Sequence, residues 1–143
     1  MSSDLGKIAE SFVKDYFDNL KSKQIYTARF ADTYDANKGR WGDPSQKKVI
    51  ITRKPCDMML VIKGMTYFCE VKSTENKKGL KSSLFTKQYA ERTRIVSAGG
   101  NYLYLIYSYA KEKWYWVPFE DLNENATWEE LDKFFVDIPK VPL

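Results

Sequence analysis

The stretch Pro55–Lys72, with the sequence PCDMMLVIKGMTYFCEVK, constrains the fold of this chain more than any other part. Apolar and β-branched residues fill two runs, Cys56–Ile62 and Met65–Lys72, and the dipeptide Lys63-Gly64 separates them. Such runs are typical of strands, and glycine readily supplies the positive φ that a tight turn requires. The stretch therefore predicts a β-hairpin with a two-residue loop.

Counting from this loop places two acidic residues opposite each other. Met58 pairs with Cys69, so Asp57 faces Glu70, and the two-residue period of a strand returns Lys72 to the same face. Opposed residues have Cβ atoms roughly 5 Å apart, close enough for both carboxylates to reach one cation. A one-residue bulge would turn Glu70 to the other face, so this geometry depends on the short loop.

Two interpretations of the acidic pair are open. In the first, the charged residues form a cross-strand salt bridge at a sheet edge, for which one acid and one lysine suffice. However, like charges directly opposite each other destabilise a sheet, and buried ionisable groups cost free energy unless they are paired or bound to a metal. The second interpretation, a metal site, accounts for both acids, and it is the one that we favour.

The other face of the predicted hairpin is apolar and includes both cysteines of the chain. The cysteines occupy diagonal positions on it, which favours core packing over a disulfide. The residues of this face are Cys56, Met58, Leu60, Ile62, Met65, Tyr67, Cys69 and Val71.

The composition limits the chemistry that is available. The 143 residues suffice for one domain, 1–143, and a hydrophobic content of 43% argues against disorder. Histidine is absent, which excludes Ser-His-Asp hydrolysis, histidine-dependent nucleases and most zinc sites. Catalysis therefore has to use carboxylates, lysines and metals that prefer oxygen ligands. Because no apolar run approaches the ~20 residues of a membrane span, we expect a cytoplasmic protein without a membrane partner.

Before the hairpin we expect a helix over residues 4–21, where apolar residues recur every three or four positions. Glu10 lies at the border of this apolar stripe and can point to where helix and sheet meet, although its spacing alone indicates an ordinary solvated glutamate. Strands are expected over Ile25–Thr33 and Lys48–Lys54. Residues 30–48 form a turn-rich basic loop with three candidate DNA contacts, which are Lys38, Arg40 and Trp41. A solvated loop with its aromatic ring tucked underneath is equally consistent with this pattern.

Positive charge follows the hairpin directly. A polar turn leads into a helix that we expect over Ser83–Ala98, ended by Gly99-Gly100. Gln88 in this helix can reach toward the end of the hairpin, but read alone it is an ordinary polar helix residue. The candidate DNA contacts in the turn and the helix are Lys77, Lys78, Lys81, Lys87 and Arg92.

The rest of the chain predicts two more strands and a short helix. The apolar run Tyr102–Tyr109 is typical of a strand covered on both faces, and we expect it to lie parallel to the second hairpin strand. A further strand covers Trp114–Phe119, a capping box of Thr127 with Glu130 starts a short helix, and residues 139–143 are expected to form a loose tail. Together the elements predict a mixed α/β sandwich.

The acidic pair suits Mg²⁺, which takes oxygen ligands and commonly uses one or two protein carboxylates together with substrate phosphate oxygens. Asp57, Glu70 and the carbonyl of Val71 are such ligands, and Mn²⁺ is expected to substitute. Lys72 can orient the attacking water or neutralise charge on the phosphate. With the lysines that follow, this set indicates hydrolysis of a phosphodiester bond.

These residues resemble the PD-(D/E)XK nuclease motif, in which an aspartate and a Glu-x-Lys lie on one hairpin, here Asp57 and Glu70-Val71-Lys72. The order of a helix glutamate, the hairpin, a lysine-rich turn and a helix bearing Gln88 is similar to that of Holliday-junction resolvases of the archaeal Hjc and bacterial RecU types. The similarity covers roughly residues 4–119.

The resemblance implies a restriction-endonuclease-like three-layer core, with a mixed central β-sheet flanked by helices. It implies a Mg²⁺-dependent endodeoxyribonuclease in which Asp57 and Glu70 bind the metal, Lys72 serves catalysis, Glu10 contributes to metal binding and Gln88 assists. It also implies a homodimer that acts on four-way DNA junctions in recombination and repair.

Two other functions remain open. A repair, restriction-like or DNA-end-processing nuclease would use the same site on a different DNA substrate. A DNA-binding module without turnover would keep the fold alone, but the presence of Asp57, Glu70 and Lys72 argues against it.

Overall fold

The computed structural model describes residues 2–20, 24–30, 54–86 and 89–143. Its helices are α1 (Ser2–Asn19), α3 (Tyr89–Ser97) and α4 (Trp128–Leu131), with short 3₁₀ helices at Ser82–Phe85, Phe119–Asp121 and Asp132–Phe134. Its strands are β1 (Ile25–Arg29), β2 (Met58–Ile62), β3 (Met65–Thr74), β4 (Asn101–Ser108), β5 (Lys113–Pro118) and β6 (Phe135–Val136).

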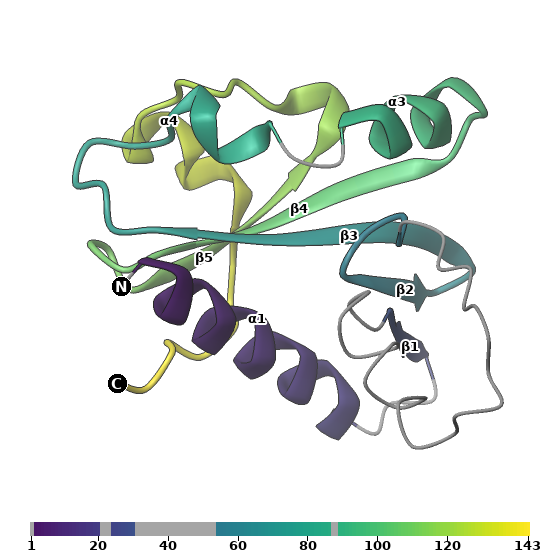
Figure 1. Cartoon of the computed structure of the whole chain (residues 1–143). Coiled ribbons are helices and arrows are strands. Elements are labelled where there is room, and N and C mark those ends of the chain that lie inside the picture. Colours follow the sequence, from purple (N-terminus) through teal and green to yellow (C-terminus); the bar gives the residue numbers. More distant parts are fainter. Residues whose placement is uncertain (1, 21–23, 31–53, 87–88) are drawn as a thin grey trace, which may run out of the picture.

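The strands form one mixed sheet in the order β1-β2-β3-β4-β5-β6. Figure 1 shows α1 on one face of this sheet and α3 and α4 on the other, and it places the two ends of the chain on the same side of the molecule. The strands β3 and β4 are parallel, whereas every other neighbouring pair is antiparallel. The expected α/β class, a mixed sheet flanked by helices, is confirmed.

The predicted hairpin is present with its two-residue loop. Lys63 and Gly64 have φ angles of 49° and 84°, and two positive φ angles are the mark of a type I′ turn, whose twist matches that of the flanking strands. The register pairs Met58 with Cys69 and Ile62 with Met65, as counting from the loop predicts.

The start of the hairpin departs from that count. The strand β2 begins at Met58, which faces Cys69, and the Asp57 N–H also donates to the Cys69 carbonyl, at 3.1 Å. Two residues of one strand thus oppose one residue of the other, as in a β-bulge, which shifts the alternation of side chains before Met58. As a result Cys56 does not share a face with Cys69, and Asp57 is aligned with Cys69 and not with Glu70, so both of these sequence predictions are corrected. Both cysteines are buried and free, in agreement with a packing role.

The sheet carries a hydrophobic core on each face. On the α1 face, Val13 and Phe17 pack with Leu60, Cys69 and the tail residue Val141. On the opposite face the cluster consists of residues from the sheet, the first 3₁₀ helix, α4 and the segments that lead into these elements, namely Cys56, Leu80, Phe85, Tyr102, Tyr104, Ile106, Tyr115, Val117, Ala126, Trp128 and Leu131. Because side chains of β4 alternate between the two clusters, this strand is buried on both faces, as its apolar run predicts.

The helix expected over Ser83–Ala98 is shorter than predicted. The chain forms a 3₁₀ turn at Ser82–Phe85, Thr86 is not helical, and α3 is described over Tyr89–Ser97. The end of α3 matches the prediction, because Gly99 has a φ of 89° and the N–H of Gly100 donates to the Ile95 carbonyl at 2.9 Å, as in a Schellman motif.

The capping box and the start of the first strand are confirmed, whereas two other predicted elements fall largely on residues that are not described. The capping box of Thr127 with Glu130 is present, and a strand begins at Ile25 as predicted. Residues 48–53 of the expected strand Lys48–Lys54 and residues 31–48 of the basic loop 30–48 lie outside the described residues. Within the described part of the chain, no helix combines the length and apolar character that crossing a membrane requires.

The prediction of a loose tail at 139–143 is wrong. Val141 is 4% exposed, and its N–H donates to the Tyr107 hydroxyl at 3.1 Å. The Pro139 carbonyl accepts a hydrogen bond from Trp114 Nε1, also at 3.1 Å. Val141 of the tail therefore completes the core on the α1 face, a role that the short proline-containing sequence did not indicate.

Deleting residues 139–143 is therefore expected to destabilise the protein by about 2 kcal/mol or more, because it removes a buried valine and two hydrogen bonds to core side chains. The free energy of unfolding in urea measures this effect. Removal of Leu143 alone is the matched control, since this residue is 86% exposed. Equal stability of the two shortened proteins would contradict a structural role for the tail.

Candidate active site

Asp57 is held at the point where β2 leaves the edge of β3. Its side chain is buried, with Oδ2 accepting the N–H of Val71 at 2.8 Å and Oδ1 bonded to Lys54 Nζ at 2.9 Å. A carboxylate thus accepts the strand N–H that a backbone carbonyl would otherwise accept. This arrangement fixes Asp57 beside the first residues of β3 that β2 no longer covers.

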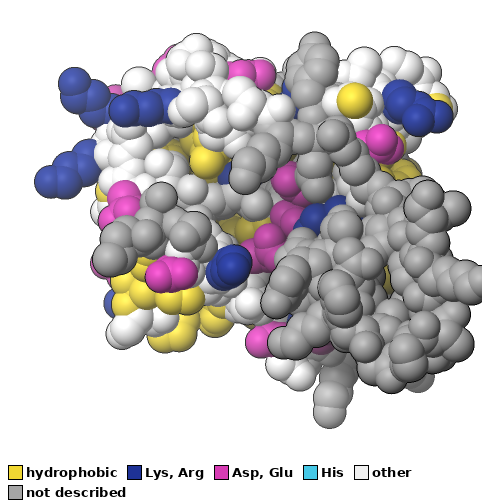
Figure 2. Space-filling view, in the orientation of Figure 1, with side chains coloured by type: hydrophobic (Ala, Val, Ile, Leu, Met, Phe, Trp, Pro, Cys, Tyr) yellow, Lys and Arg dark blue, Asp and Glu magenta, His cyan; other side chains and the backbone are white. Residues whose placement is uncertain are grey.

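Glu70 and Lys72 extend from β3 next to this point. Glu70 is 6% exposed, and its Oε2 lies 3.5 Å from Lys72 Nζ. Figure 2 shows acidic side chains and a basic one gathered near the centre of one face of the molecule, over the middle of the sheet. Two carboxylates and two lysines, Lys54 and Lys72, therefore form one buried cluster.

The edge of β3 beside this cluster has no strand partner in the described part of the chain beyond Cys69. The N–H and C=O groups of one strand residue point to the same edge. Because the Val71 N–H is directed at Asp57, the Val71 carbonyl also faces this edge. The predicted oxygen donors, two carboxylates and one carbonyl, thus come from adjacent positions.

Burial changes the acidity of the cluster. The pKa of Glu70 is raised to about 8, first by its removal from water and then by the charge of Asp57 and a hydrogen bond with it, while Lys72 opposes the shift. The carboxyl pair therefore retains a proton near neutral pH in the metal-free protein. A cation that neutralises the pair would release this proton.

Glu10 approaches the cluster from α1. Burial raises the pKa of its carboxyl, and the charge of Asp57 raises it further. Its Oε2 accepts a hydrogen bond from Lys14 Nζ at 3.0 Å. The structure thus brings Glu10 near Asp57, while pairing its carboxylate with a lysine of the same helix.

The raised pKa of Glu70 predicts a pH-dependent stability in the metal-free protein. A group whose pKa is higher in the folded state than its ordinary value of 4.5 binds its proton more tightly when folded. The contribution of Glu70 to the free energy of unfolding is therefore fully present below about pH 4.5 and is lost as the pH rises toward 8. In EDTA, the melting temperature of Glu70→Gln should therefore rise relative to that of the unmodified protein between pH 5 and pH 9, by about 4 °C or more. A constant difference over this range would contradict the shift.

The donor set fits a hard divalent cation of the Mg²⁺ type. Over residues 2–20, 24–30, 54–86 and 89–143, no three or more His, Cys, Asp or Glu side chains are arranged to hold a metal ion. Mg²⁺, however, commonly uses one or two carboxylates and fills its remaining positions with water and substrate oxygens. Asp57 and Glu70 supply that number, and in the metal-free protein Lys54 and Lys72 are the cations that balance their charge.

The remaining predicted residues have different positions. Lys77, Lys78 and Lys81 are exposed in the turn after β3, as expected for surface contacts. Five predicted site residues lie outside the described part of the chain, and these are Lys38, Arg40, Trp41, Lys87 and Gln88.

Arg92 is not placed as a DNA contact. It is 2% exposed, donates a hydrogen bond to the Tyr104 hydroxyl and lies over the Phe119 ring, with its guanidinium carbon 5.1 Å from the ring centroid. These contacts make it a core residue that fixes α3 on the sheet, and they correct the sequence prediction.

Two lysines that pair with predicted site acids were missed by the sequence reasoning. Lys54 bonds Asp57, and the largely buried Lys14 bonds Glu10. The i, i+4 spacing of Glu10 and Lys14 on one helix was a visible signal. The contact of Lys54 depends on the bend at residues 55–57, for which the strand pattern gave no indication.

Comparisons with known proteins agree with the observed fold. No protein-family model matches the sequence, and no curated protein does. Among solved structures, the chain is similar to Hjc from Archaeoglobus fulgidus, a Holliday junction resolvase from an archaeal hyperthermophile. The TM-score is 0.52 at 16% sequence identity, and the match covers 90% of this chain and 93% of Hjc. At this identity the likeness shows a shared fold and carries no residue roles with it.

Proposed function

We propose that this chain is a metal-dependent, structure-selective DNA endonuclease that resolves four-way junctions. One observation carries the proposal: the buried carboxylates of Asp57 and Glu70 meet beside Lys72, at the edge of β3 where the pairing with β2 ends. The likeness of the fold to a junction resolvase supports the choice of substrate.

In the proposed reaction the carboxylates of Asp57 and Glu70 hold Mg²⁺ together with the Val71 carbonyl. When bound there, Mg²⁺ would supply a water of lowered pKa and would neutralise charge on the scissile phosphate. Lys72, which already lies beside Glu70, turns its ammonium group to the same phosphate and orients the attacking water. Lys54 holds Asp57 in place, while Glu10 adds negative charge that favours binding of the cation.

The exposed lysines Lys77, Lys78 and Lys81 follow directly after β3 and are proposed to bind the phosphate backbone. We further propose a homodimer, because a two-fold assembly matches the symmetry of a four-way junction and can nick two strands symmetrically. Solution mass measured with and without a junction checks this proposal, and a monomer in both states would contradict it.

Incubation with Mg²⁺ and three DNA substrates tests the proposed activity. The expected result is paired, symmetric nicks in a four-way junction, with little cleavage of linear duplex or single-stranded DNA of the same sequence. Equal cleavage of linear duplex would contradict junction resolution and would support a repair, restriction-like or end-processing activity at the same site. Incubation with EDTA in place of Mg²⁺ is the control, and all three substrates should then remain intact.

A further inference from the structure

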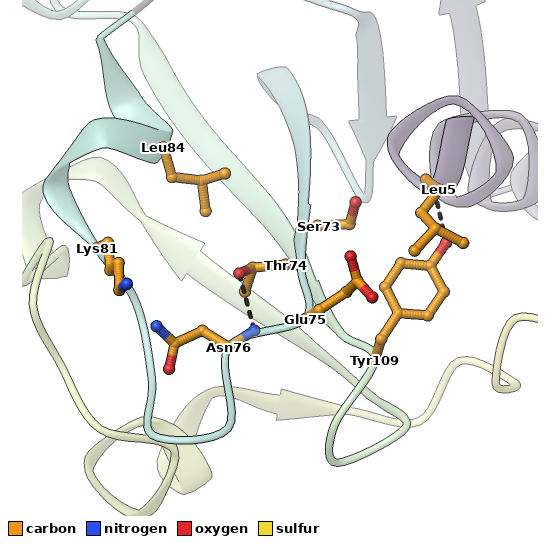
Figure 3. Close-up of a pocket in the computed structure, with 8 residues that line it drawn as sticks. All are labelled: Leu5, Ser73, Thr74, Glu75, Asn76, Lys81, Leu84 and Tyr109. Atoms are coloured by element: carbon orange, nitrogen blue, oxygen red, sulfur yellow. Dashed lines mark hydrogen bonds between the residues drawn. The ribbon is translucent and has the colours of Figure 1, made fainter. Parts of the chain in front are cut away.

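A pocket lies directly beyond the acidic cluster along β3 (Figure 3). Its volume is about 360 Å³, and its lining comes from the end of β3, the following turn, α1 and Tyr109. Thr74 in this lining is two residues past Lys72, or about 7 Å along the strand. A DNA strand whose phosphate lies at the cluster can therefore continue over the pocket.

Two opposite walls of the pocket are apolar. Figure 3 shows Leu84 on one side and Leu5 with Tyr109 on the other. The Tyr109 hydroxyl donates a hydrogen bond to the Leu5 carbonyl at 2.5 Å, which fixes the ring against α1. A planar group with apolar faces fits between such walls, and nucleobases are groups of this kind.

Asn76 presents a fixed hydrogen-bond donor to the pocket. Its Oδ1 accepts the N–H groups of Lys78 and Gly79 at 2.8 and 3.3 Å, and its own carbonyl accepts Trp128 Nε1 at 2.9 Å. Because the oxygen is held by the turn, the amide NH₂ is the group left to donate. Figure 3 shows this nitrogen on the Lys81 side of the pocket.

Glu75 supplies the matching acceptor. Figure 3 shows its carboxylate between Thr74 and Tyr109, within the space that the walls enclose. A carboxylate repels a phosphate group but accepts hydrogen bonds from ring and amino N–H groups. The pocket thus combines a donor, an acceptor and apolar walls, with the cation of Lys81 at the side.

We propose that this pocket binds one unpaired guanine of the DNA strand that is cleaved, an inference that rests on the proposed function. Guanine carries an acceptor, O6, beside donors on its Watson–Crick edge, which complements Asn76 and Glu75. That edge is accessible only when the base is unpaired. Lys81 contacts the phosphate next to this base.

Binding of short oligonucleotides tests the inference. Fluorescence anisotropy in EDTA compares a labelled thymidine pentamer with the same pentamer carrying one central guanine. The guanine pentamer is expected to bind about tenfold more tightly, and Asn76→Asp or Glu75→Gln should each remove most of this preference. Asn76→Asp retains the oxygen that Lys78 and Gly79 require, so it isolates the lost donor. Glu112→Gln, on an exposed turn outside the pocket, is the matched control and should keep the preference.

Several results would overturn the inference. These are equal affinity for the two pentamers, an unchanged preference in both pocket variants, or binding of deoxyguanosine monophosphate as tight as that of the guanine pentamer. The junction-cleavage assay separates this failure from that of the proposed function. If the protein cleaves junctions but shows no preference for guanine, only the proposal of guanine binding in the pocket is wrong. If it prefers guanine but cleaves no DNA, the proposed endonuclease activity is wrong.

Discussion

Replacing Asp57 by asparagine is expected to lower the rate of Mg²⁺-dependent DNA cleavage by a factor of about 10³ or more. The carboxylate is buried beside Glu70 at the edge of β3, and the neutral amide removes one of the two carboxylates that are proposed to bind the metal. The same loss is expected for Glu70→Gln. Single-turnover cleavage of a four-way junction measures both rates.

DNA binding distinguishes this loss from a general defect. In EDTA or calcium, both variants should bind the junction within a few-fold of the unmodified protein, because neither carboxylate is exposed enough to contact the phosphate backbone. The exposed acids Asp137 and Glu120 offer matched controls, and Asp137→Asn and Glu120→Gln should cleave normally. A rate for Asp57→Asn close to that of the unmodified protein would refute the assignment of the site.

The hairpin was predictable because its information is local. A two-residue loop fixes the register by counting, and the positive φ angles of Lys63 and Gly64 give that loop the geometry that the sequence indicates. The parallel pairing of β3 with β4 was predictable for a similar reason, since a helical segment ending at two glycines separates two apolar strands.

The site was less predictable where it depends on departures from regular structure. The bulge at Asp57 is set by how the chain enters β2, and it moves Cys56 to the other face while directing Asp57 to the Val71 N–H. Burial of Arg92 and of the tail depends on tertiary contacts with Tyr104 and Tyr107, which no local pattern encodes. The pocket beyond β3 was missed for the same reason, because its walls come from segments that are distant in the sequence.

Replacing Lys72 by methionine is expected to lower the cleavage rate at saturating DNA by a factor of about 10² to 10⁴, the usual contribution of a group that moves or stabilises charge in a reaction. Methionine keeps most of the volume of the side chain, so packing beside Glu70 is preserved while the ammonium group is lost. Affinity for the junction in calcium should change little, since Lys77, Lys78 and Lys81 are proposed to supply the contacts to the phosphate backbone.

The metal dependence of Lys72→Met separates catalysis from metal binding. Lys72 is the cation that partly neutralises Glu70, so its removal leaves the carboxylates more dependent on Mg²⁺. Stabilisation of the variant by Mg²⁺ in thermal unfolding should therefore equal or exceed that of the unmodified protein, even though cleavage is lost. Lys133→Met, at an exposed position, should change neither property. Loss of both cleavage and Mg²⁺ stabilisation in Lys72→Met would show that Lys72 maintains the metal site, and the proposed part of this lysine in the reaction would then be wrong.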